Sequence, residues 1–325
     1  MKSRPQIFVS SPLPGQAIAW TREAGDVVLG ASGVGVRGEE FLARAASFDG
    51  LVTLLTDRVD DALLDRMPTL RLVANVAVGV DNIDLAACAA RKVTVTNTPG
   101  VLTETSADLA FALLLAAARR VAEGDRLVRA KQFHGFRFDM LVGVPVHGST
   151  LGLVGFGRIG QAMARRARGF GMHVLYTQKT RLAPQLETAL GATYVGLEEL
   201  FAEAHMVSLH CPLTDETRGL VSERLLARMR PGSILVNTAR GACVDEAALA
   251  RALRDGPLGA AGLDVFAREG ATRVDIDDAL LACDNMVFTP HIGSADLPAR
   301  TAMAEIAAQN VAAFFRGEDP PNAVR

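Results

Sequence analysis

Three side chains that could share one reaction each follow a short apolar run in the second half of the chain: Arg240, Glu269 and His291. Each run has the length of a β-strand, and ligands of an open parallel sheet bind outside the carboxyl ends of its strands. We therefore expect the three residues to face one crevice. A fixed cation, a carboxylate and an imidazole form the set that reduces a 2-keto acid with a nicotinamide.

The chemistry of this set gives each side chain a role. Arg240 would bind the substrate carboxylate and polarise the keto oxygen, because a guanidinium forms strong hydrogen bonds with such oxygens. Glu269 would hold the imidazole and favour its protonated form. His291 would give its proton to the developing alkoxide as hydride arrives and take it back in the reverse direction. Taken singly, these residues could equally be a helix-cap partner, a surface charge and a turn residue.

A glycine-rich segment lies between a predicted strand, 151–154, and a predicted helix, 161–168, and its residues are Gly155, Phe156, Gly157, Arg158, Ile159 and Gly160. In a dinucleotide-binding turn the first glycine permits the tight turn and the second lets the backbone approach a pyrophosphate. The third allows close packing of helix on strand, and the phosphates lie at the helix N-terminus. This context favours a dinucleotide cofactor more than the string alone does.

The residues after the next predicted strand, 173–176, indicate whether the coenzyme is NADH or NADPH. A carboxylate there would accept hydrogen bonds from both ribose hydroxyls of NADH. The chain has no carboxylate before Glu187 and instead reads Thr177, Gln178, Lys179, Thr180 and Arg181. Cations and hydroxyls suit a 2′-phosphate, so we expect NADPH to be preferred. The alternative is an ordinary solvated loop that tolerates NADH.

The elements that must position these residues follow from the hydrophobic pattern. From about residue 150 onward, apolar runs of strand length alternate with amphipathic stretches. The alternation predicts parallel strands with crossover helices, and hence an open α/β sheet covered on both faces. The runs are 151–154, 173–176, 205–209, 233–236, 260–263 and 285–288, and the helical stretches include 161–168, 198–204 and 246–253.

The first hundred residues show the same alternation more weakly, with runs at 6–9, 50–54, 71–76 and 93–95, which predicts a second, smaller α/β domain. A helix that Thr103 or Ser106 could cap comes next, and its run 109–118 is apolar on every face. Such a helix usually lies between two packed bodies, so we expect the domain junction and partner contacts here. Residues 299–315 predict another helix.

Composition narrows the classes of protein. The 325 residues suggest about two domains at about 150 residues each. With 34 Lys and Arg against 36 Asp and Glu, the net charge of −2 gives no general attraction to nucleic acid. The longest apolar run has ten residues, and a bilayer needs about 20, so we expect no membrane span and a cytoplasmic protein. The four cysteines, Cys88, Cys211, Cys243 and Cys283, form no metal-binding pair and are expected to be buried thiols, with no metal bound.

Six segments carry a family resemblance, and they are 78–84 (VGVDNID), 98–104 (TPGVLTE), 155–160 (GFGRIG), 237–241 (NTARG), 262–266 (GLDVF) and 290–294 (PHIGS). Together they resemble the NAD(P)-dependent D-2-hydroxyacid dehydrogenases, and within that family the glyoxylate/hydroxypyruvate reductases. The segments follow the family's order through nearly the whole chain. The resemblance implies two Rossmann-like, doubly wound parallel-sheet domains, with a dinucleotide-binding domain at 99–293 inserted into a flavodoxin-like substrate domain at 1–98 and 294–325.

The resemblance also implies roles for individual residues. Arg240, Glu269 and His291 match the family's catalytic residues, and Arg240 and His291 also contact substrate. Backbone amides near Val78 and Gly79 would hold the substrate carboxylate. Matches to positions around the cofactor are Thr103, Pro212, Thr238, Ala239, Asp264 and Gly293, with Asp264 near the nicotinamide carboxamide. His210 lines the same cleft, where we expect its role to be structural. Family members are usually homodimers joined through the cofactor domain, and their cleft closes by a hinge.

The chain departs from the family where the family often reads Glu-x-Glu-Pro, because here residues 267–270 are Ala-Arg-Glu-Gly. The catalytic Glu269 is kept, but the proline that would stiffen its segment is absent. Residues 276–281 are similar to phosphite dehydrogenases, which carry a lysine where this chain has Val78, and formate dehydrogenases have Gln in place of Glu269. We therefore expect a reductase of glyoxylate or hydroxypyruvate. The alternatives are another or bulkier 2-hydroxy acid, such as a 2-ketogluconate type, phosphite, or a nucleotide-sensing, corepressor-like binding module.

Overall fold

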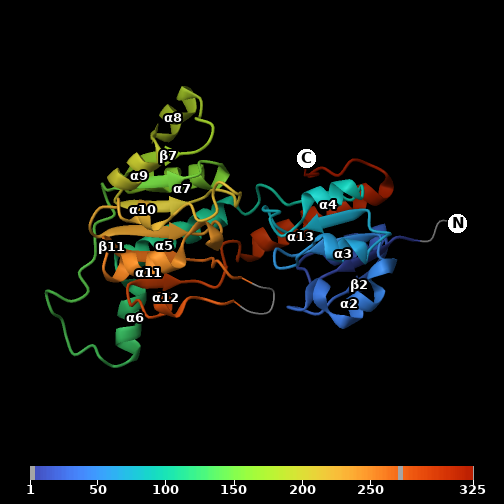
Figure 1. Cartoon of the computed structure of the whole chain (residues 1–325), viewed down its shortest axis with the longest axis horizontal. Helices are drawn as coiled ribbons and strands as arrows, with labels where there is room; N and C mark the ends of the chain where they lie inside the picture. The colour runs from blue at the N-terminus through green and yellow to red at the C-terminus, as the bar shows by residue number, and fades with distance from the viewer. Residues whose placement is uncertain (1–3, 270–273, 325) are drawn as a thin grey trace. The chain divides into compact units, whose positions relative to one another are not determined.

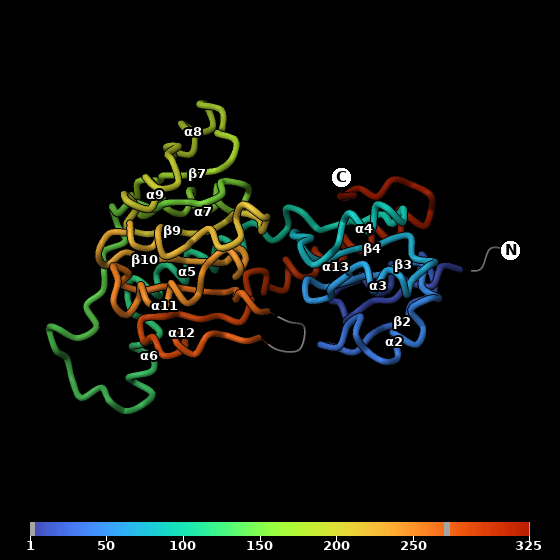
Figure 2. Tube along the Cα trace, viewed as in Figure 1, coloured from blue at the N-terminus to red at the C-terminus, as the bar shows by residue number. Residues whose placement is uncertain are grey.

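The computed structural model describes residues 4–269 and 274–324, and these residues form two compact units. The first unit contains residues 4–102, 274 and 294–324, and the second contains 103–269 and 275–293. Figure 2 traces this order: the blue N-terminal segment and the red C-terminal segment belong to one unit, although the whole second unit separates them in sequence. Each unit is built on a parallel sheet, so the predicted fold class is confirmed.

The sheet of the first unit has five parallel strands in the order β2-β1-β3-β4-β5, which is the flavodoxin order. The strands are β1 (Gln6–Val9), β2 (Asp26–Leu29), β3 (Gly50–Thr53), β4 (Leu72–Asn75) and β5 (Thr94–Thr96). Helices α2 (Glu39–Arg44), α3 (Asp61–Asp65) and α4 (Leu85–Ala90) pack on one face, and α1 (Ala17–Ala24) and α13 (Leu297–Arg316) on the other (Figure 1).

The sheet of the second unit has seven parallel strands in the order β12-β11-β10-β9-β6-β7-β8. The six from β8 to β11 follow the dinucleotide-binding order 3-2-1-4-5-6. The strands are β6 (Thr150–Val154), β7 (His173–Thr177), β8 (Ala192–Tyr194), β9 (Met206–Leu209), β10 (Ser233–Asn237), β11 (Leu258–Leu263) and β12 (Met286–Phe288).

Helices cover both faces of this seven-stranded sheet (Figure 1). One face carries α5 (Thr103–Ala118) and α7 (Arg158–Gly169), and the other carries α9 (Leu197–Glu203), α10 (Glu223–Leu226), α11 (Glu246–Arg254) and α12 (Asp278–Leu281). Helices α6 (Val121–Arg129) and α8 (Pro184–Leu190) complete the unit. All five residues of β10 are buried, as expected for a strand covered on both sides.

The two units divide between residues 102 and 103, at the start of α5, where the domain junction was expected, but the helix packs differently from the expectation. Its apolar run packs inside the second unit, against α7, β10 and β11, rather than between two bodies. The small side chains of Ala107, Ala110 and Ala117 let it approach the sheet closely. Ser106 does not cap the helix either, because it lies within α5 and its hydroxyl donates to the carbonyl oxygen of Gly293 at 2.9 Å.

Two strands, β2 and β8, have no counterpart in the sequence prediction. Each is an edge strand, paired on one side only within the described sheets. Residues of β2 are half-buried or exposed, so the strand lacks the apolar run that marks a central parallel strand. The four cysteines are buried and form no disulfide. Within the described ranges, no helix has the length and apolarity needed to span a membrane.

Candidate active site

The carboxyl edge of the seven-stranded sheet gathers the segments that the sequence singled out. Because all seven strands are parallel, the residues after β6, β9, β10, β11 and β12 lie along one edge. The strand order reverses between β6 and β9, since β7 lies on the far side of β6. Such a reversal is where doubly wound sheets bind their ligands. The glycine-rich turn starts at this point.

The imidazole of His291 is paired with the carboxylate of Glu269. Nδ1 of His291 lies 2.6 Å from Oε2 of Glu269, and Oε1 of Glu269 accepts a hydrogen bond from the Phe266 amide at 2.6 Å. The side chains are 27% and 20% exposed, so the pair is packed on the protein yet open to a ligand. With Nδ1 engaged, Nε2 is the ring nitrogen available to exchange a proton with a substrate.

The segment that carries His291 is held by Asp264, whose side chain follows β11 and is 1% exposed. One carboxylate oxygen accepts from the Thr289 hydroxyl at 2.6 Å and the Ile292 amide at 2.8 Å, and the other accepts from the Gly293 amide at 2.8 Å. Burial raises the pKa of Asp264, and these hydrogen bonds and His291 oppose the rise. His291 itself has a φ of 52°, so this clamp supports a backbone conformation that costs energy in a non-glycine residue.

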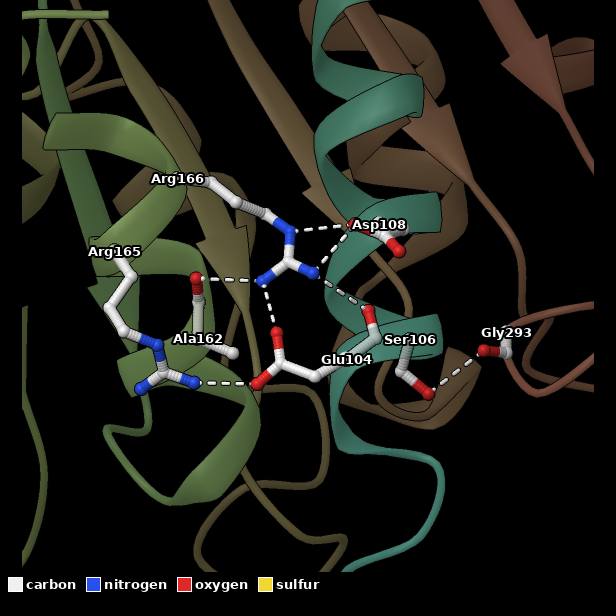
Figure 3. Close-up of polar contacts among 7 residues, drawn as sticks. All are labelled: Glu104, Ser106, Asp108, Ala162, Arg165, Arg166 and Gly293. Carbon is white, nitrogen blue, oxygen red and sulfur yellow. Dashed lines mark hydrogen bonds and ion pairs between the residues drawn. The ribbon is translucent and has the colours of Figure 1, made fainter. Parts of the chain in front are cut away.

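A second clamp acts on the same segment from α5 (Figure 3). The hydroxyl of Ser106 donates to the carbonyl oxygen of Gly293 at 2.9 Å, while the Gly293 amide is bound by Asp264. The amide and carbonyl groups of Gly293 are therefore both held by hydrogen bonds with side chains. The sequence did not reveal this role of Ser106, because a serine in the first turns of a helix gives no signal for such a distant contact.

Arg240 follows β10 in a turn that Asn237 organises. The Asn237 side chain is fully buried, donates to the Arg240 carbonyl oxygen at 2.8 Å and accepts from the Ala239 amide at 2.9 Å. Nη1 of Arg240 donates to the Ala239 carbonyl oxygen at 2.8 Å. A Cβ placed on Gly241 would lie 1.9 Å from the carbonyl carbon of Phe266, so only glycine allows this turn to pack on the segment that carries Glu269.

The glycine-rich turn meets the packing demands of a dinucleotide site. Gly155 has a φ of +89°, and a Cβ on it would lie 2.6 Å from the Cys211 amide nitrogen. A Cβ on Gly160 would lie 2.4 Å from the Gly155 carbonyl oxygen. A Cβ on Gly157 would meet no protein atom within 4 Å, so the fold itself does not require glycine there. The open space before α7 is what a pyrophosphate needs, and the residues therefore fit the cofactor.

Two further observations fit a cofactor along this edge. The hydroxyl of Thr238 is buried and has no hydrogen-bond partner among the described residues, as expected if a ligand supplies it. His210 follows β9, and its Nε2 forms a hydrogen bond with the Ser208 hydroxyl at 2.9 Å. Burial lowers the pKa of His210 to about 3. His210 is therefore neutral at physiological pH and suits a lining role rather than proton transfer. Pro212, another predicted cofactor residue, is held at its carbonyl oxygen, which accepts a hydrogen bond from the Thr217 hydroxyl at 2.6 Å.

Gln178 stands at the end of β7, where a carboxylate would accept from the ribose of NADH. Its Oε1 accepts from the Phe156 amide at 3.2 Å, and its Nε2 donates to the Thr180 carbonyl oxygen at 2.6 Å. The side chain thus links the glycine-rich turn to the loop 178–181. Lys179 is a cation of the same loop; the pKa of Glu216 is lowered first by the hydrogen bond from the Thr214 hydroxyl and to a smaller extent by the charge of Lys179.

Arg181 has a partner that was not expected from the sequence. Its Nε and Nη2 donate to the two oxygens of Glu187, each at 2.8 Å, and its guanidinium lies 5.5 Å from the centre of the Tyr194 ring. The Tyr176 hydroxyl also donates to Glu187, at 2.6 Å. These contacts, that of Arg181 first, lower the pKa of Glu187 to about 2. The loop is therefore less positive than its sequence indicates, because one of its two cations is neutralised.

The predicted carboxylate-binding residues Val78 and Gly79 lie in the first unit, just after β4. The Val78 carbonyl oxygen accepts from the Asn97 side chain at 2.8 Å, and the Gly79 carbonyl oxygen accepts from the Asn75 side chain at 2.9 Å. Two asparagines thus fix the peptide orientations of this turn. Among the described residues, no group of three or more His, Cys, Asp or Glu side chains could hold a metal ion.

The helix that begins at the glycine-rich turn is tied to α5 by ion pairs (Figure 3). Arg166 on α7 donates to Glu104 at 2.8 Å and to Asp108 at 2.6 Å, and also to the Glu104 and Ala162 carbonyl oxygens. Arg165 donates to the other oxygen of Glu104 at 2.6 Å. This network joins the second half of α7 to the first turns of α5.

Comparison with known proteins settles the family. The model of the "D-isomer specific 2-hydroxyacid dehydrogenase, NAD binding domain" matches residues 111–293. A glyoxylate reductase of Thermococcus litoralis is 45% identical over 325 residues, which cover 99% of this chain and 97% of the relative. The chain belongs to the D-2-hydroxyacid dehydrogenases. The family prediction from the six motifs is confirmed, as is the prediction of an NAD(P)-dependent dehydrogenase.

Solved structures of other D-2-hydroxyacid dehydrogenases and related proteins share the architecture along the whole chain. A protein of Thermus thermophilus is 44% identical, with a TM-score of 0.88 over 98% of this chain and 100% of that chain. An NADPH-dependent glyoxylate/hydroxypyruvate reductase of Sinorhizobium meliloti, solved with NADP and malonate, is 32% identical, with a TM-score of 0.85 over 99% of this chain and 97% of that chain.

Proposed function

We propose that this D-2-hydroxyacid dehydrogenase reduces glyoxylate or hydroxypyruvate to the corresponding 2-hydroxy acid, the D isomer in the latter case, with NADPH as the preferred coenzyme. The observation that carries the proposal is the 2.6 Å pair between His291 and Glu269, at the sheet edge that also bears Arg240 and the glycine-rich turn. Relatives named glyoxylate reductase support the substrate, since one of them is 45% identical.

The proposed reaction divides the work between three side chains. The bound nicotinamide supplies a hydride equivalent for the keto carbon. Arg240 binds the substrate carboxylate and draws electron density from the keto oxygen. Nε2 of His291 gives a proton to that oxygen as the alcohol forms, and Glu269 stabilises the imidazolium that starts the cycle. The amides of Val78 and Gly79 complete the binding of the substrate carboxylate. Oxidation of the alcohol reverses each transfer.

The coenzyme would be held by residues that follow six strands of the second unit, and by Thr103 at the start of α5. Amides of the glycine-rich turn and the start of α7 would bind the pyrophosphate, and Thr238 and its neighbours would line the nicotinamide side. Apart from the loop after β7, the set comprises Thr103, Gly155, Gly157, Arg158, Ile159, Gly160, His210, Pro212, Thr238, Ala239, Asp264 and Gly293. Gln178, Lys179, Thr180 and Arg181 would surround the adenosine ribose. A neutral Gln178 does not repel a 2′-phosphate as a carboxylate would, which supports NADPH over NADH.

Steady-state kinetics with both coenzymes and a panel of keto acids tests the proposal. We expect glyoxylate or hydroxypyruvate to give the highest kcat/KM, and NADPH to exceed NADH. The variant His291→Ala is expected to lose turnover by at least about 100-fold while still binding NADPH. A higher kcat/KM for a bulkier keto acid or for NADH would overturn the corresponding part. Tight NADPH binding without turnover of any keto acid would overturn the enzymatic function itself.

We also propose that the protein is a homodimer formed through the second unit. The segment after α6 exposes aromatic side chains to an unusual degree, with Phe136 86% and Phe138 94% exposed, and Val142 is 67% exposed. Exposed apolar side chains gathered in one segment are typical of an interface. A cavity of about 270 Å³ lies beside this segment, between α5 and the amino ends of β10 to β12, and it would accept apolar side chains from a second copy.

A further inference from the structure

The turn that carries Glu269 is held by two carboxylates, only one of which belongs to the expected catalytic set. The Phe266 amide donates to Oε1 of Glu269 at 2.6 Å, and the next amide, that of Ala267, donates to Oε1 of Glu246 at 2.7 Å. Consecutive peptide groups are thus fixed by side chains from two parts of the chain. Glu246 comes from α11, 21 residues earlier in sequence.

Glu246 is an unusual residue to find at its position. It begins α11 and is 9% exposed, whereas a glutamate in the first turn of a helix is normally solvated. The helix does not need it as a cap, because Asp245 already accepts from the Ala248 amide at 2.9 Å. Burial raises the pKa of Glu246, an effect reinforced by Asp277 and Glu269 and opposed by the Ala267 amide and Arg268. A carboxylate kept buried among these groups acts on the neighbouring turn.

Among the described residues, the other supports of the turn are an exposed ion pair and the packing of Phe266 in the core. Arg268 pairs with Asp275 at 3.0 Å, but their side chains are 61% and 54% exposed, and such surface pairs stabilise little. The proline that the family often has after the catalytic glutamate is replaced in the sequence by Gly270, which lies outside the described residues. Phe266 is buried in the core, where Gly241 packs against its backbone and its ring contacts the ring of Phe288. Among the described residues, the Glu246 hydrogen bond is therefore a buried polar anchor of the turn, next to the bond between Glu269 and the Phe266 amide.

We propose that Glu246 is a positioning residue for proton transfer: by holding the Ala267 amide, it fixes the turn that sets Glu269 against Nδ1 of His291. The inference rests on the proposed function, because it assumes that the Glu269–His291 pair moves the proton. A displacement of about 1 Å in a catalytic group lowers the rate by up to about 100-fold. Glu246 thus supplies a hold on the turn in a sequence that has Gly270 where the family often has proline.

Three variants of Glu246 separate positioning from charge and from folding. Glu246→Gln keeps an oxygen acceptor at the same reach, Glu246→Asp keeps the charge but is too short to reach Ala267, and Glu246→Ala removes both. We expect kcat to fall about 10- to 100-fold in the Ala and Asp variants and by less than about threefold in the Gln variant. The dissociation constant of NADPH should stay within about twofold in all three. Glu223→Ala, which removes an exposed glutamate paired with Arg251, is the control and should match the wild type.

Hydrogen exchange of the segment 264–269 in the free protein supplies a readout that does not depend on substrate. Exchange should accelerate in the Ala and Asp variants and stay at the wild-type rate in the Gln variant. If the Ala variant does not fold, the Asp variant carries the test. Wild-type kcat in the Asp variant, equal losses in the Gln and Asp variants, or unchanged exchange would each overturn the proposal. Failure of the proposed function would appear separately, as a wild-type protein that turns over no keto acid.

Discussion

At the scale of single residues, the proposed catalytic residues stand in segments that other side chains hold by hydrogen bonds to the backbone. Arg240, Glu269 and His291 are identified by their types and by their places after strands. Their partners are less visible, because Asn237, Ser106 and Glu246 act through backbone groups, two of them far away in sequence. A side chain that binds a distant peptide group produces no periodicity or fixed spacing in the sequence. The side chains that hold the catalytic set in place are therefore what sequence reasoning misses.

Gln178 allows a direct test of coenzyme choice. The variant Gln178→Glu is nearly isosteric and still accepts from the Phe156 amide, so it changes mainly the charge beside the adenosine ribose. We expect the ratio of kcat/KM for NADPH to that for NADH to fall at least about 10-fold, since a carboxylate binds ribose hydroxyls and repels a 2′-phosphate. Lys179→Met should lower kcat/KM for NADPH and leave NADH unaffected. A ratio that neither variant alters would refute the assignment of this loop.

The pair of Arg181 with Glu187 predicts a pH dependence of stability. The pKa of Glu187 is lowered to about 2, first by Arg181 and then by Tyr176. Because the pKa in the folded state lies below the ordinary value of 4.5, the pair stabilises the fold above about pH 4.5, and this contribution is lost as pH falls toward 2. The melting temperature of Glu187→Gln should therefore be lower than that of the wild type at pH 7, and the gap should narrow at pH 3. A gap that widened on acidification would contradict the pairing.

At the scale of elements, the alternation of strand and helix predicts the central strands and fails at the edges. The buried strands β6, β9 and β10 carry continuous apolar runs, whereas β2 pairs on one side only and is half-buried or exposed. The helix α5 shows a different limit of prediction from the hydrophobic pattern. A run that is apolar on all faces indicates burial but does not identify what buries it, and here the sheet of its own unit and α7 do so.

The ion-pair network between α5 and α7 predicts unequal effects of two neighbouring arginines. Arg166 is 20% exposed and reaches Glu104, Asp108 and two carbonyl oxygens, while Arg165 is 49% exposed and, within the described part of the chain, reaches Glu104 alone. We expect Arg166→Ala to lower the free energy of unfolding by about 1–3 kcal/mol and Arg165→Ala by less than about 1 kcal/mol. Urea denaturation followed by circular dichroism measures both. Equal losses would show that the network is not centred on Arg166.

At the scale of the whole molecule, the proposed dimer makes a prediction of its own. The double variant Phe136→Ser and Phe138→Ser removes the two most exposed aromatic side chains of the described residues. We expect light scattering after size-exclusion chromatography to give a dimer for the wild type and a monomer for this variant, because the segment contributes the apolar contacts. Leu297→Ser, at a 72% exposed position in the first unit, is the control and should stay dimeric. A monomeric wild type would refute the proposal.

The return of the chain to the first unit sets the order in which the two units can complete their folding during synthesis. Met303, Ala307 and Val311 of α13 share a core with Ile7 and Val9 of β1, although the whole second unit is translated between them. Domains of a growing chain fold as their residues leave the ribosome. The second unit, which ends at residue 293, therefore has all its residues available before α13 emerges. Residues 4–102 are therefore translated before the second unit but complete their fold after it. Until α13 emerges, the apolar face of β1 that α13 covers stays exposed.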